Sequence, residues 1–330
     1  MRLIGRIARF SRGYGKVGKI ETVFNRVQLL EINADQAGQR IDNFLLTRLK
    51  GVPKSRVYRL LRKGEVRVNK GRIRPEYRLM QNDVVRVPPI RVSQQVTAVP
   101  GRSLRDVLSQ SILLETEEFL VLNKPFGLAV HGGSGINLGV IESLRAMREP
   151  HAYLELAHRL DRDTSGCLLI AKSRRVLKHL QDQMRHRSMD KRYITLVSGR
   201  WAKERREVNA PLLKQTVASG ERIVRVSNQG KASFTRFKLL QHYANASLLE
   251  VKLETGRTHQ IRVHCQLVGH PLAGDPKYGN EGFNQTLREV GLKRLFLHAA
   301  QLAFISPASG EKVKVEAPLP DELAALLKKL

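Results

Sequence analysis

Residues 158–166 read HRLDRDTSG and lead directly into an apolar run, CLLIA, at 167–171. The run has the length and composition of a buried β-strand, so the polar stretch is expected to form the loop that enters it. Asp161 lies in this loop between Arg159 and Arg162. A carboxylate flanked by guanidinium groups is either a structural ion pair or a functional group, and this short stretch taken alone favours the ion pair.

Similar apolar runs recur from residue 109 to the C-terminus, after a polar stretch at 92–108 that we interpret as a linker. They are separated by Gly or Pro and do not alternate regularly with helical segments. This pattern predicts an α+β domain with a mixed, mainly antiparallel sheet over 109–330. A helical period is present at 174–187 and again near the C-terminus. The predicted strands are 119–122, 167–171, 193–197, 223–226, 248–253, 296–305 and 313–315.

The charge of the chain indicates the kind of partner it binds. Among 330 residues, 58 are Lys or Arg and 30 are Asp or Glu, so the net charge is +28. Residues 1–26 and 35–91 together carry more than half of this excess. Such a charge favours nucleic acid before an anionic membrane. No apolar stretch is long enough to span a membrane, and Cys167 and Cys265 make neither a disulfide framework nor a zinc cluster, so a reducing cytoplasm is the expected location.

Residues 1–33 are expected to form a basic leader without fixed structure. Arginines alternate with apolar residues near its start, which also fits a short amphipathic helix. An RNA-clinging arm and an organelle transit peptide are therefore alternatives. The transit peptide is the least favoured, because Ser is not clearly enriched.

Residues 34–91 have the pattern of a small globular module. Apolar residues at helical spacing predict two short helices, and alternating valines predict a small sheet after them. The second helix carries a stripe of basic side chains opposite its apolar face, with no acidic residue at i+4 to neutralise them. Most charged stripes are only solvated, but one of a single sign favours binding to RNA or DNA. The stripe consists of Arg56, Arg59, Arg62 and Lys63.

A second polar cluster, TGRTHQIRVH, lies at 255–264. Arg262 is placed either to pair with Asp161 or to contact a phosphate. His259 and His264 are five residues apart rather than four, and no acid lies between them, so the spacing excludes a zinc site of the H-E-x-x-H type. Each histidine is expected to pack or to form hydrogen bonds.

Two further stretches can be interpreted either as functional or as purely structural. Tyr193 begins the predicted strand in KRYITLV at 191–197, where it is either a core or rim aromatic or a platform on which a base stacks. The glycine-rich HGGSG at 131–135 lacks the spacing and the lysine of a P-loop, so nucleoside triphosphate binding is not expected.

Taken together, these stretches resemble known families. AGQRIDNFLLTRLKGVPKSRVYRLLRKGEVRVNKG and its continuation to Pro89 resemble the alpha-L RNA-binding module. NKPFGLAVHGGSG, HRLDRDTSG, KRYITLV, GRTHQIRVH, GHPLAGDPKYG and FLHAAQLAF, in this order, resemble the RluA-type pseudouridine synthases, and most of all those that act on large-subunit ribosomal RNA. The resemblance runs from about residue 30 to the C-terminus; the first 25 residues depart from it.

The resemblance implies an isomerase that detaches uracil from its ribose, rotates it and rejoins it through carbon, without a cofactor or a metal. Asp161 would be the catalytic carboxylate, Tyr193 would stack on the base and serve in proton transfer, and Arg262 would orient Asp161. Arg159 would fill the space that the flipped nucleotide leaves. Asp161 either attacks the anomeric carbon to form an ester or removes the neighbouring ribose proton to form a glycal; the sequence leaves both routes open.

The implied partner is 23S ribosomal RNA or a large-subunit assembly intermediate, modified at several uridines near the peptidyl-transferase region. Nothing in the sequence demands more than a monomer. Two alternatives stay open at this point. One is a non-catalytic RNA-binding assembly factor, and the other is an enzyme aimed at transfer RNA or at another ribosomal uridine.

Overall fold

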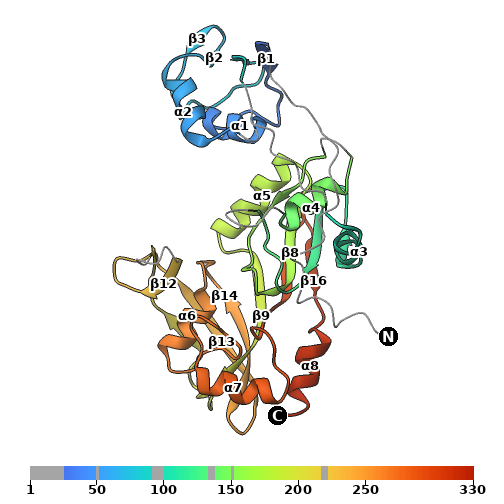
Figure 1. Ribbon diagram of the computed structural model, residues 1–330, viewed down its shortest axis with the longest axis vertical. Coiled ribbons are helices and arrows are strands. Elements are labelled where there is room, and N and C mark those ends of the chain that lie inside the picture. The colour runs from blue at the N-terminus through green and yellow to red at the C-terminus, as the bar shows by residue number, and fades with distance from the viewer. Residues whose placement is uncertain (1–25, 50–51, 91–99, 133–137, 150–151, 217–221) are drawn as a thin grey trace. The chain divides into compact units, whose positions relative to one another are not determined.

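The computed structural model describes residues 26–49, 52–90, 100–132, 138–149, 152–216 and 222–330. They belong to two compact units, Met1–Gly101 and Arg102–Leu330, which Figure 1 draws in blue and in teal to red. The expected N-terminal amphipathic helix falls outside the described residues. Across the described residues, no helix is long and apolar enough to cross a membrane.

The first unit is a small four-stranded sheet with two helices. Ile41 and Leu45 on the first helix and Val57 and Leu61 on the second are buried, as their helical spacing predicts. They share one core with three valines of the sheet, Val68, Val85 and Val87. The strand order is β1-β4-β2-β3. The elements are β1 (Gln28–Glu31), α1 (Ile41–Arg48), α2 (Lys54–Arg62), β2 (Arg67–Val68), β3 (Gly71–Arg72) and β4 (Val84–Val87).

The predicted boundary of the leader at residue 33 is wrong for its last part, because β1 lies inside the range 1–33. Gln28 to Glu31 pair with Val87 to Val84 of β4 in an antiparallel ladder. Burial alternates along this strand, with Leu30 half-buried against the core and Leu29 exposed. A four-residue strand with one inward side chain has too weak a period to be found by pattern alone.

The second unit is built on a ten-stranded sheet of order β10-β13-β14-β9-β15-β8-β6-β5, with β16 paired to β15 and β7 paired to β8. Among the described pairs in this sheet, only β15 and β8 run parallel. The mixed, mainly antiparallel α+β fold is therefore as predicted. Its strands are β5 (Ile112–Glu115), β6 (Phe119–Lys124), β7 (Glu155–Leu156), β8 (Ser165–Ala171), β9 (Asp190–Ser198), β10 (Glu207–Asn209), β13 (Phe234–His242), β14 (Ala246–Leu253), β15 (Leu297–Ile305) and β16 (Lys312–Glu316).

A separate hairpin and six helices complete this unit in the described part of the chain (Figure 1). The hairpin joins β11 (Leu212–Thr216) to β12 (Arg222–Val226). The helices are α3 (Arg102–Gln110), α4 (Val140–Ala146), α5 (Arg174–Arg185), α6 (Gln260–Leu267), α7 (Glu281–Glu289) and α8 (Asp321–Leu327).

Residues 102–108 of the predicted linker form most of α3 instead. Leu104 and Leu108 are four residues apart and therefore lie on one face of the helix. Leu108 is fully buried in the main core of the second unit, and Leu104 packs against that core. Apart from Val107, the other residues of the helix are polar, which is why its composition resembles that of a linker.

Strand β8 explains why the apolar run after HRLDRDTSG is continuous rather than alternating. Leu168 and Ile170 face one core, whereas Cys167, Leu169 and Ala171 face another on the opposite side of the sheet. All seven residues of the strand are buried. Packing on both faces fixes the position of this strand, so the end of the loop that enters it is fixed as well.

Gly166 is needed at the start of this strand. Its φ of +107° is one that side-chain-bearing residues rarely adopt. A Cβ placed there would collide with the carbonyl oxygen of Ala299, because β8 and β15 approach closely at this point. The glycine therefore brings the Asp161 loop against the middle of the sheet.

Candidate active site

A cavity of about 670 Å³ lies beside the loop between β7 and β8 in the second unit. Four residues predicted to act at one site, Arg159, Asp161, Tyr193 and Arg262, all line it. They come from this loop, from β9 and from α6, so the fold brings together residues about one hundred positions apart.

The cavity is strongly cationic. Its carboxylates among the described lining residues are Asp161 and Glu254, and Glu254 already accepts a 3.0 Å hydrogen bond from Arg236. The Asp161 side chain is 28% exposed, so water and a ligand can reach it. The lysines and arginines of the lining are Arg159, Arg185, Lys191, Lys214, Arg257 and Arg262.

The backbone around Asp161 is held from behind by a buried lysine. Lys124 is fully buried, and its Nζ donates to the carbonyl oxygens of Pro125 and Leu128 at 2.8 Å and of Arg162 at 3.0 Å. The Arg162 oxygen also accepts from the N–H of Gly127 at 3.0 Å. Three acceptors match the three protons of an ammonium group. The residue directly after Asp161 is therefore fixed to the end of β6.

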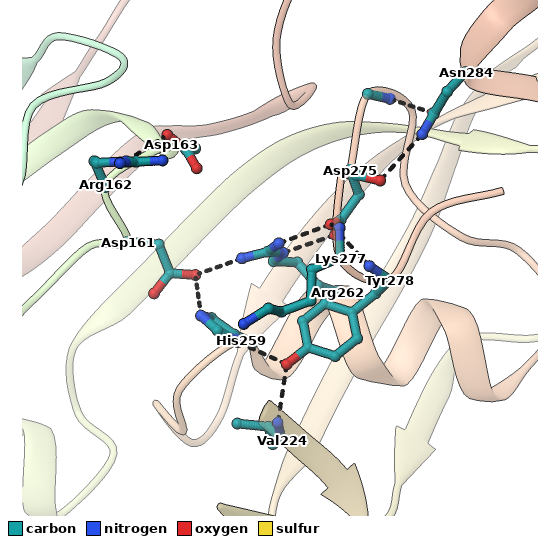
Figure 2. Close-up of polar contacts among 11 residues, drawn as sticks. Asp161, Arg162, Asp163, Val224, His259, Arg262, Asp275, Lys277, Tyr278 and Asn284 are labelled. Atoms are coloured by element: carbon teal, nitrogen blue, oxygen red, sulfur yellow. Dashed lines mark hydrogen bonds and ion pairs between the residues drawn. The ribbon is translucent and has the colours of Figure 1, made fainter. Parts of the chain in front are cut away.

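Arg262 is buried, and its principal partner is Asp275 rather than Asp161. Its Nε and Nη2 each donate a 2.7 Å hydrogen bond to the Asp275 carboxylate, while Nη1 faces Asp161 Oδ2 at 3.6 Å (Figure 2). The guanidinium also lies 5.0 Å from the ring centre of Tyr278. Burial alone would lower the pKa of Arg262, but Asp275 and Asp161 raise it overall. Arg262 is thus a fixed cation that presents one free nitrogen to Asp161.

Tyr193 is a core aromatic that also borders the cavity. Its side chain is only 7% exposed and belongs to the main core, yet it also lines the cavity. Its strand, β9, lies between β14 and β15, where Tyr193 pairs with Val251. Burial raises the pKa of Tyr193 above its ordinary value, and the negative charge of Asp161 acts in the same direction. The phenol is therefore protonated at neutral pH.

The two histidines of the 255–264 cluster differ. His264 is fully buried and hydrogen-bonded to Thr235 and Ser233, as expected of a packing residue. His259 instead lines the cavity, and its Nε2 lies 3.8 Å from Asp161 Oδ2. Pattern analysis singled out neither this contact nor the role of Asp275.

A signal for Asp275 was present in the sequence. GHPLAGDPKYG contains a single acid and a tyrosine, Asp275 and Tyr278, and both pack on Arg262. An arginine expected to be buried needs a carboxylate partner, and this stretch supplies one. What the sequence does not reveal is that the loop after α6 folds back onto that helix.

The predicted basic stripe lies on α2 of the first unit. Arg59, Arg62 and Lys63 are exposed and Arg56 is half-buried, while the opposite face of the helix enters the core. The stripe therefore points to solvent, as RNA-binding side chains must.

Comparison with known proteins agrees with the fold. Residues 118–267 match the family model described as RNA pseudouridylate synthase, and residues 39–85 match the S4 domain. The chain is 55% identical to ribosomal large subunit pseudouridine synthase C of Pasteurella multocida, over 94% of this chain and 96% of the relative. It is also 55% identical to the protein of that name from Escherichia coli K12, over 92% and 97%.

Solved structures give the same result. Human RNA pseudouridylate synthase domain containing 4 is 27% identical, with a TM-score of 0.57 over 69% of this chain and 95% of that one. Human RNA pseudouridylate synthase domain containing 1 is 30% identical, with a TM-score of 0.53 over 65% and 86%.

The fold and the relatives define an isomerase that acts on RNA. The chain belongs to the RNA pseudouridine synthase family, with an S4 domain preceding the synthase domain. The relatives that share the name pseudouridine synthase C match it over nearly the whole of both chains.

Proposed function

We propose that this chain converts specific uridines of 23S ribosomal RNA to pseudouridine, at several sites near the peptidyl-transferase centre. The names of the relatives supply the substrate class. The observation that supports the chemistry is the partly exposed carboxylate of Asp161 in a cavity otherwise lined by cations. On a surface that attracts phosphates a partly exposed acid weakens binding, so its presence favours a chemical role.

The reaction is an isomerisation and therefore balances within the nucleotide. The bond from ribose C1′ to uracil N1 breaks, a bond from C1′ to C5 forms, and a proton is lost from C5 while N1 gains one. Asp161 acts at the ribose, either by attacking C1′ to form an ester or by removing the neighbouring ribose proton to form a glycal. Both routes need an ionised carboxylate, and neither needs a cofactor.

The target uridine has to leave the RNA stack before its glycosidic bond can be reached. Unstacking costs a few kcal/mol. Tyr193 supports the flipped base by stacking on it in the cavity, and its hydroxyl group takes part in the proton transfer. The exposed side chain of Arg159 at the cavity edge fills the gap in the RNA, because a guanidinium both stacks and hydrogen-bonds.

Basic residues outside the cavity hold the RNA. Arg56, Arg59, Arg62 and Lys63 on α2 contact phosphates of a folded segment, either in free 23S RNA or in an assembling large subunit. We propose that the protein acts in the cytoplasm as a monomer.

The test compares Asp161→Asn with a matched control, Asp163→Asn. Asp163 pairs with Arg162 at 3.1 Å and does not line the cavity (Figure 2). On unmodified 23S RNA, wild type and Asp163→Asn should form pseudouridine, mapped by mass spectrometry, and Asp161→Asn should form none while binding RNA normally. Product from Asp161→Asn would overturn the site assignment.

The same measurement separates the alternatives. A wild-type protein that binds 23S RNA without turnover would indicate an assembly factor. Uridine maps of transfer and ribosomal RNA from cells lacking the gene would show whether the missing modifications lie in the large subunit. A deficit confined to transfer RNA would overturn the proposed substrate.

A further inference from the structure

The hydroxyl group of Tyr278 determines which nitrogen of His259 carries the proton. It accepts a 2.9 Å hydrogen bond from the N–H of Val224 and lies 2.8 Å from His259 Nδ1 (Figure 2). Tyr278 is only 5% exposed. If Nδ1 were protonated, the hydroxyl would accept twice and its own proton would have no partner among the described residues. A buried donor left unpaired is unfavourable, because it loses its hydrogen bond to water without replacement. The hydroxyl therefore donates to a bare Nδ1, and the proton of His259 is on Nε2.

That proton faces the carboxylate of Asp161. His259 Nε2 is 3.8 Å from Oδ2, and Arg262 Nη1 approaches the same oxygen to 3.6 Å. Within the described part of the chain, no hydrogen bond or ion pair reaches Oδ1. Figure 2 shows this second oxygen pointing away from the cluster. Both donors therefore face Oδ2 of Asp161, whereas Oδ1 is left to interact with a ligand.

The backbone of His259 is an independent indication that its position matters. It precedes α6 with φ 53° and ψ 20°, in the left-handed region. This conformation is unfavourable for a residue with a side chain, although His tolerates it better than most. Such strain persists where surrounding structure enforces it and clusters at functional sites. Here it directs the ring between Tyr278 and Asp161.

We propose that His259 is a positioning residue, which stays neutral with its proton on Nε2 and, with Arg262, holds Asp161 Oδ2 so that Oδ1 acts on the ribose. This inference rests on the proposed function of Asp161. Burial lowers the pKa of His259, and the charges of Arg262 and Lys277 act in the same direction, against Asp161 and Asp275. Arg262 already compensates the charge of Asp161, so a second cation is not required.

The first test reads the tautomer directly and does not depend on activity. The full chain is labelled with ring-¹⁵N histidine, and the His259 signals are assigned by their disappearance in His259→Gln. At pH 7 the wild type should show a bare Nδ1 and a protonated Nε2. A protonated Nδ1, alone or in an imidazolium, would overturn the proposal and leave the proposed function standing.

The second test compares two amide replacements. Gln places an N–H near the position of Nε2, whereas Asn reaches only as far as Nδ1 but adopts the left-handed conformation more readily. If His259 positions Asp161, His259→Gln should keep most of kcat and His259→Asn should lose about 10²-fold, with KM for RNA unchanged in both. Equal rates, or a faster Asn variant, would indicate a purely conformational role and overturn the proposal.

Tyr278→Phe provides a variant that keeps the ring packed on Arg262. It removes the proton donor to Nδ1 together with the acceptor of the Val224 N–H, so the His259 signals should shift toward a mixture of tautomers and kcat should fall with KM unchanged. An unchanged tautomer would contradict the assignment of Tyr278. Absence of turnover in wild type would instead overturn the proposed function, whatever the tautomer.

Discussion

Arg262 donates two hydrogen bonds of 2.7 Å to Asp275, and this pairing decides which of its nitrogens faces Asp161. The Asp275 side chain is fully buried and also accepts from the N–H groups of Lys277 and Tyr278. One carboxylate therefore fixes the guanidinium, and the guanidinium in turn restrains the other carboxylate. The ion pair with Asp161 is the weaker of the two contacts because it is longer and more exposed.

Removing the charge of Asp275 should destabilise the second unit. Asp275→Asn leaves Arg262 buried without its counter-ion, and breaking a buried pair in this way costs about 3–5 kcal/mol. Urea unfolding followed by fluorescence measures this unit, because the single tryptophan, Trp201, is buried there. The control Glu316→Gln breaks the exposed pair with Lys314 and should cost less. An unfolding free energy equal to wild type for Asp275→Asn would contradict this account.

The cost of Asp275→Asn should depend on pH. Burial alone would raise the pKa of Asp275, but the hydrogen bonds and charge of Arg262 lower it overall. A carboxyl group whose pKa is lower in the folded than in the unfolded state stabilises the folded protein at pH values above its unfolded pKa of about 3.9. This stabilisation is lost as the pH falls through the folded-state pKa. The gap in urea midpoint between wild type and variant should therefore be constant near pH 7 and shrink below about pH 4. A difference in urea midpoint that grows as the pH falls would contradict the predicted direction of this pH dependence.

Lys124→Met should loosen the Asp161 loop. Methionine fills the apolar space of the lysine stem but leaves the carbonyl oxygens of Pro125 and Leu128 without a donor among the described residues, at about 1–3 kcal/mol for an unpaired buried group. The Arg162 oxygen keeps only its hydrogen bond from the Gly127 N–H, so kcat should fall together with stability. Lys172→Met is the control, since Lys172 makes a partly exposed pair with Glu115 and its removal should cost about 1 kcal/mol or less. Full activity of Lys124→Met would show that the loop needs no such anchor.

The two roles proposed for Tyr193 can be separated by size and by polarity. Tyr193→Phe keeps the ring and removes the hydroxyl, so RNA affinity should hold while kcat falls about 10²–10⁴-fold. Tyr193→Leu removes the stacking surface as well, which is worth about 1–3 kcal/mol per base and should raise KM. Single-turnover kinetics beside filter binding measures both. If Tyr193→Phe keeps the wild-type kcat, the hydroxyl group takes no part in the reaction and stacking is the remaining role of Tyr193.

The stripe on α2 should control the salt dependence of RNA binding. Replacing Arg56, Arg59 and Arg62 together by Gln should reduce the slope of log affinity against log salt by about one for each phosphate that the variant no longer binds. The chemical step should stay near the wild-type rate at saturating RNA. A control of equal charge change replaces Lys293, Lys312 and Lys328, which are exposed in the second unit. Equal slopes in both triple variants would mean that the stripe is only solvated.

The local sequence pattern is sufficient to predict those helices and strands whose buried residues form a regular apolar pattern within the element itself. The apolar run at 167–171 is found as a strand because both of its faces are covered, and Arg174–Arg185 is found as a helix because its apolar face is regular. Strand β1 and helix α3 are not found, since each gains its stability from a few side chains packed on distant elements. Residue type alone leaves Asp161, Tyr193 and Arg262 with a structural as well as a functional interpretation, and the family resemblance supplies the roles expected of them.

The network behind Asp161 depends on pairings that no local pattern contains. Asp275 reaches Arg262 through a loop that returns to its own helix, and His259 acquires its contact only when α6 is placed against the loop before β8. These are long-range contacts, determined by the order of strands in the sheet. Free energy gained across the whole domain selects that order, which is why the surroundings of a site are harder to predict than its central residue.

The parallel contact between β15 and β8 has a mechanical consequence. Among the described residues, two rungs, His298 with Ser165 and Ala299 with Gly166, form the backbone ladder between the half of the sheet that carries Asp161 and the half that carries Arg262. The site therefore spans a joint in the backbone ladder, which the side-chain cores on both faces of the sheet cover. A load applied by RNA across the sheet would concentrate at this joint, and the spacing between the carboxylate and its guanidinium would register the bend before any strand had to break.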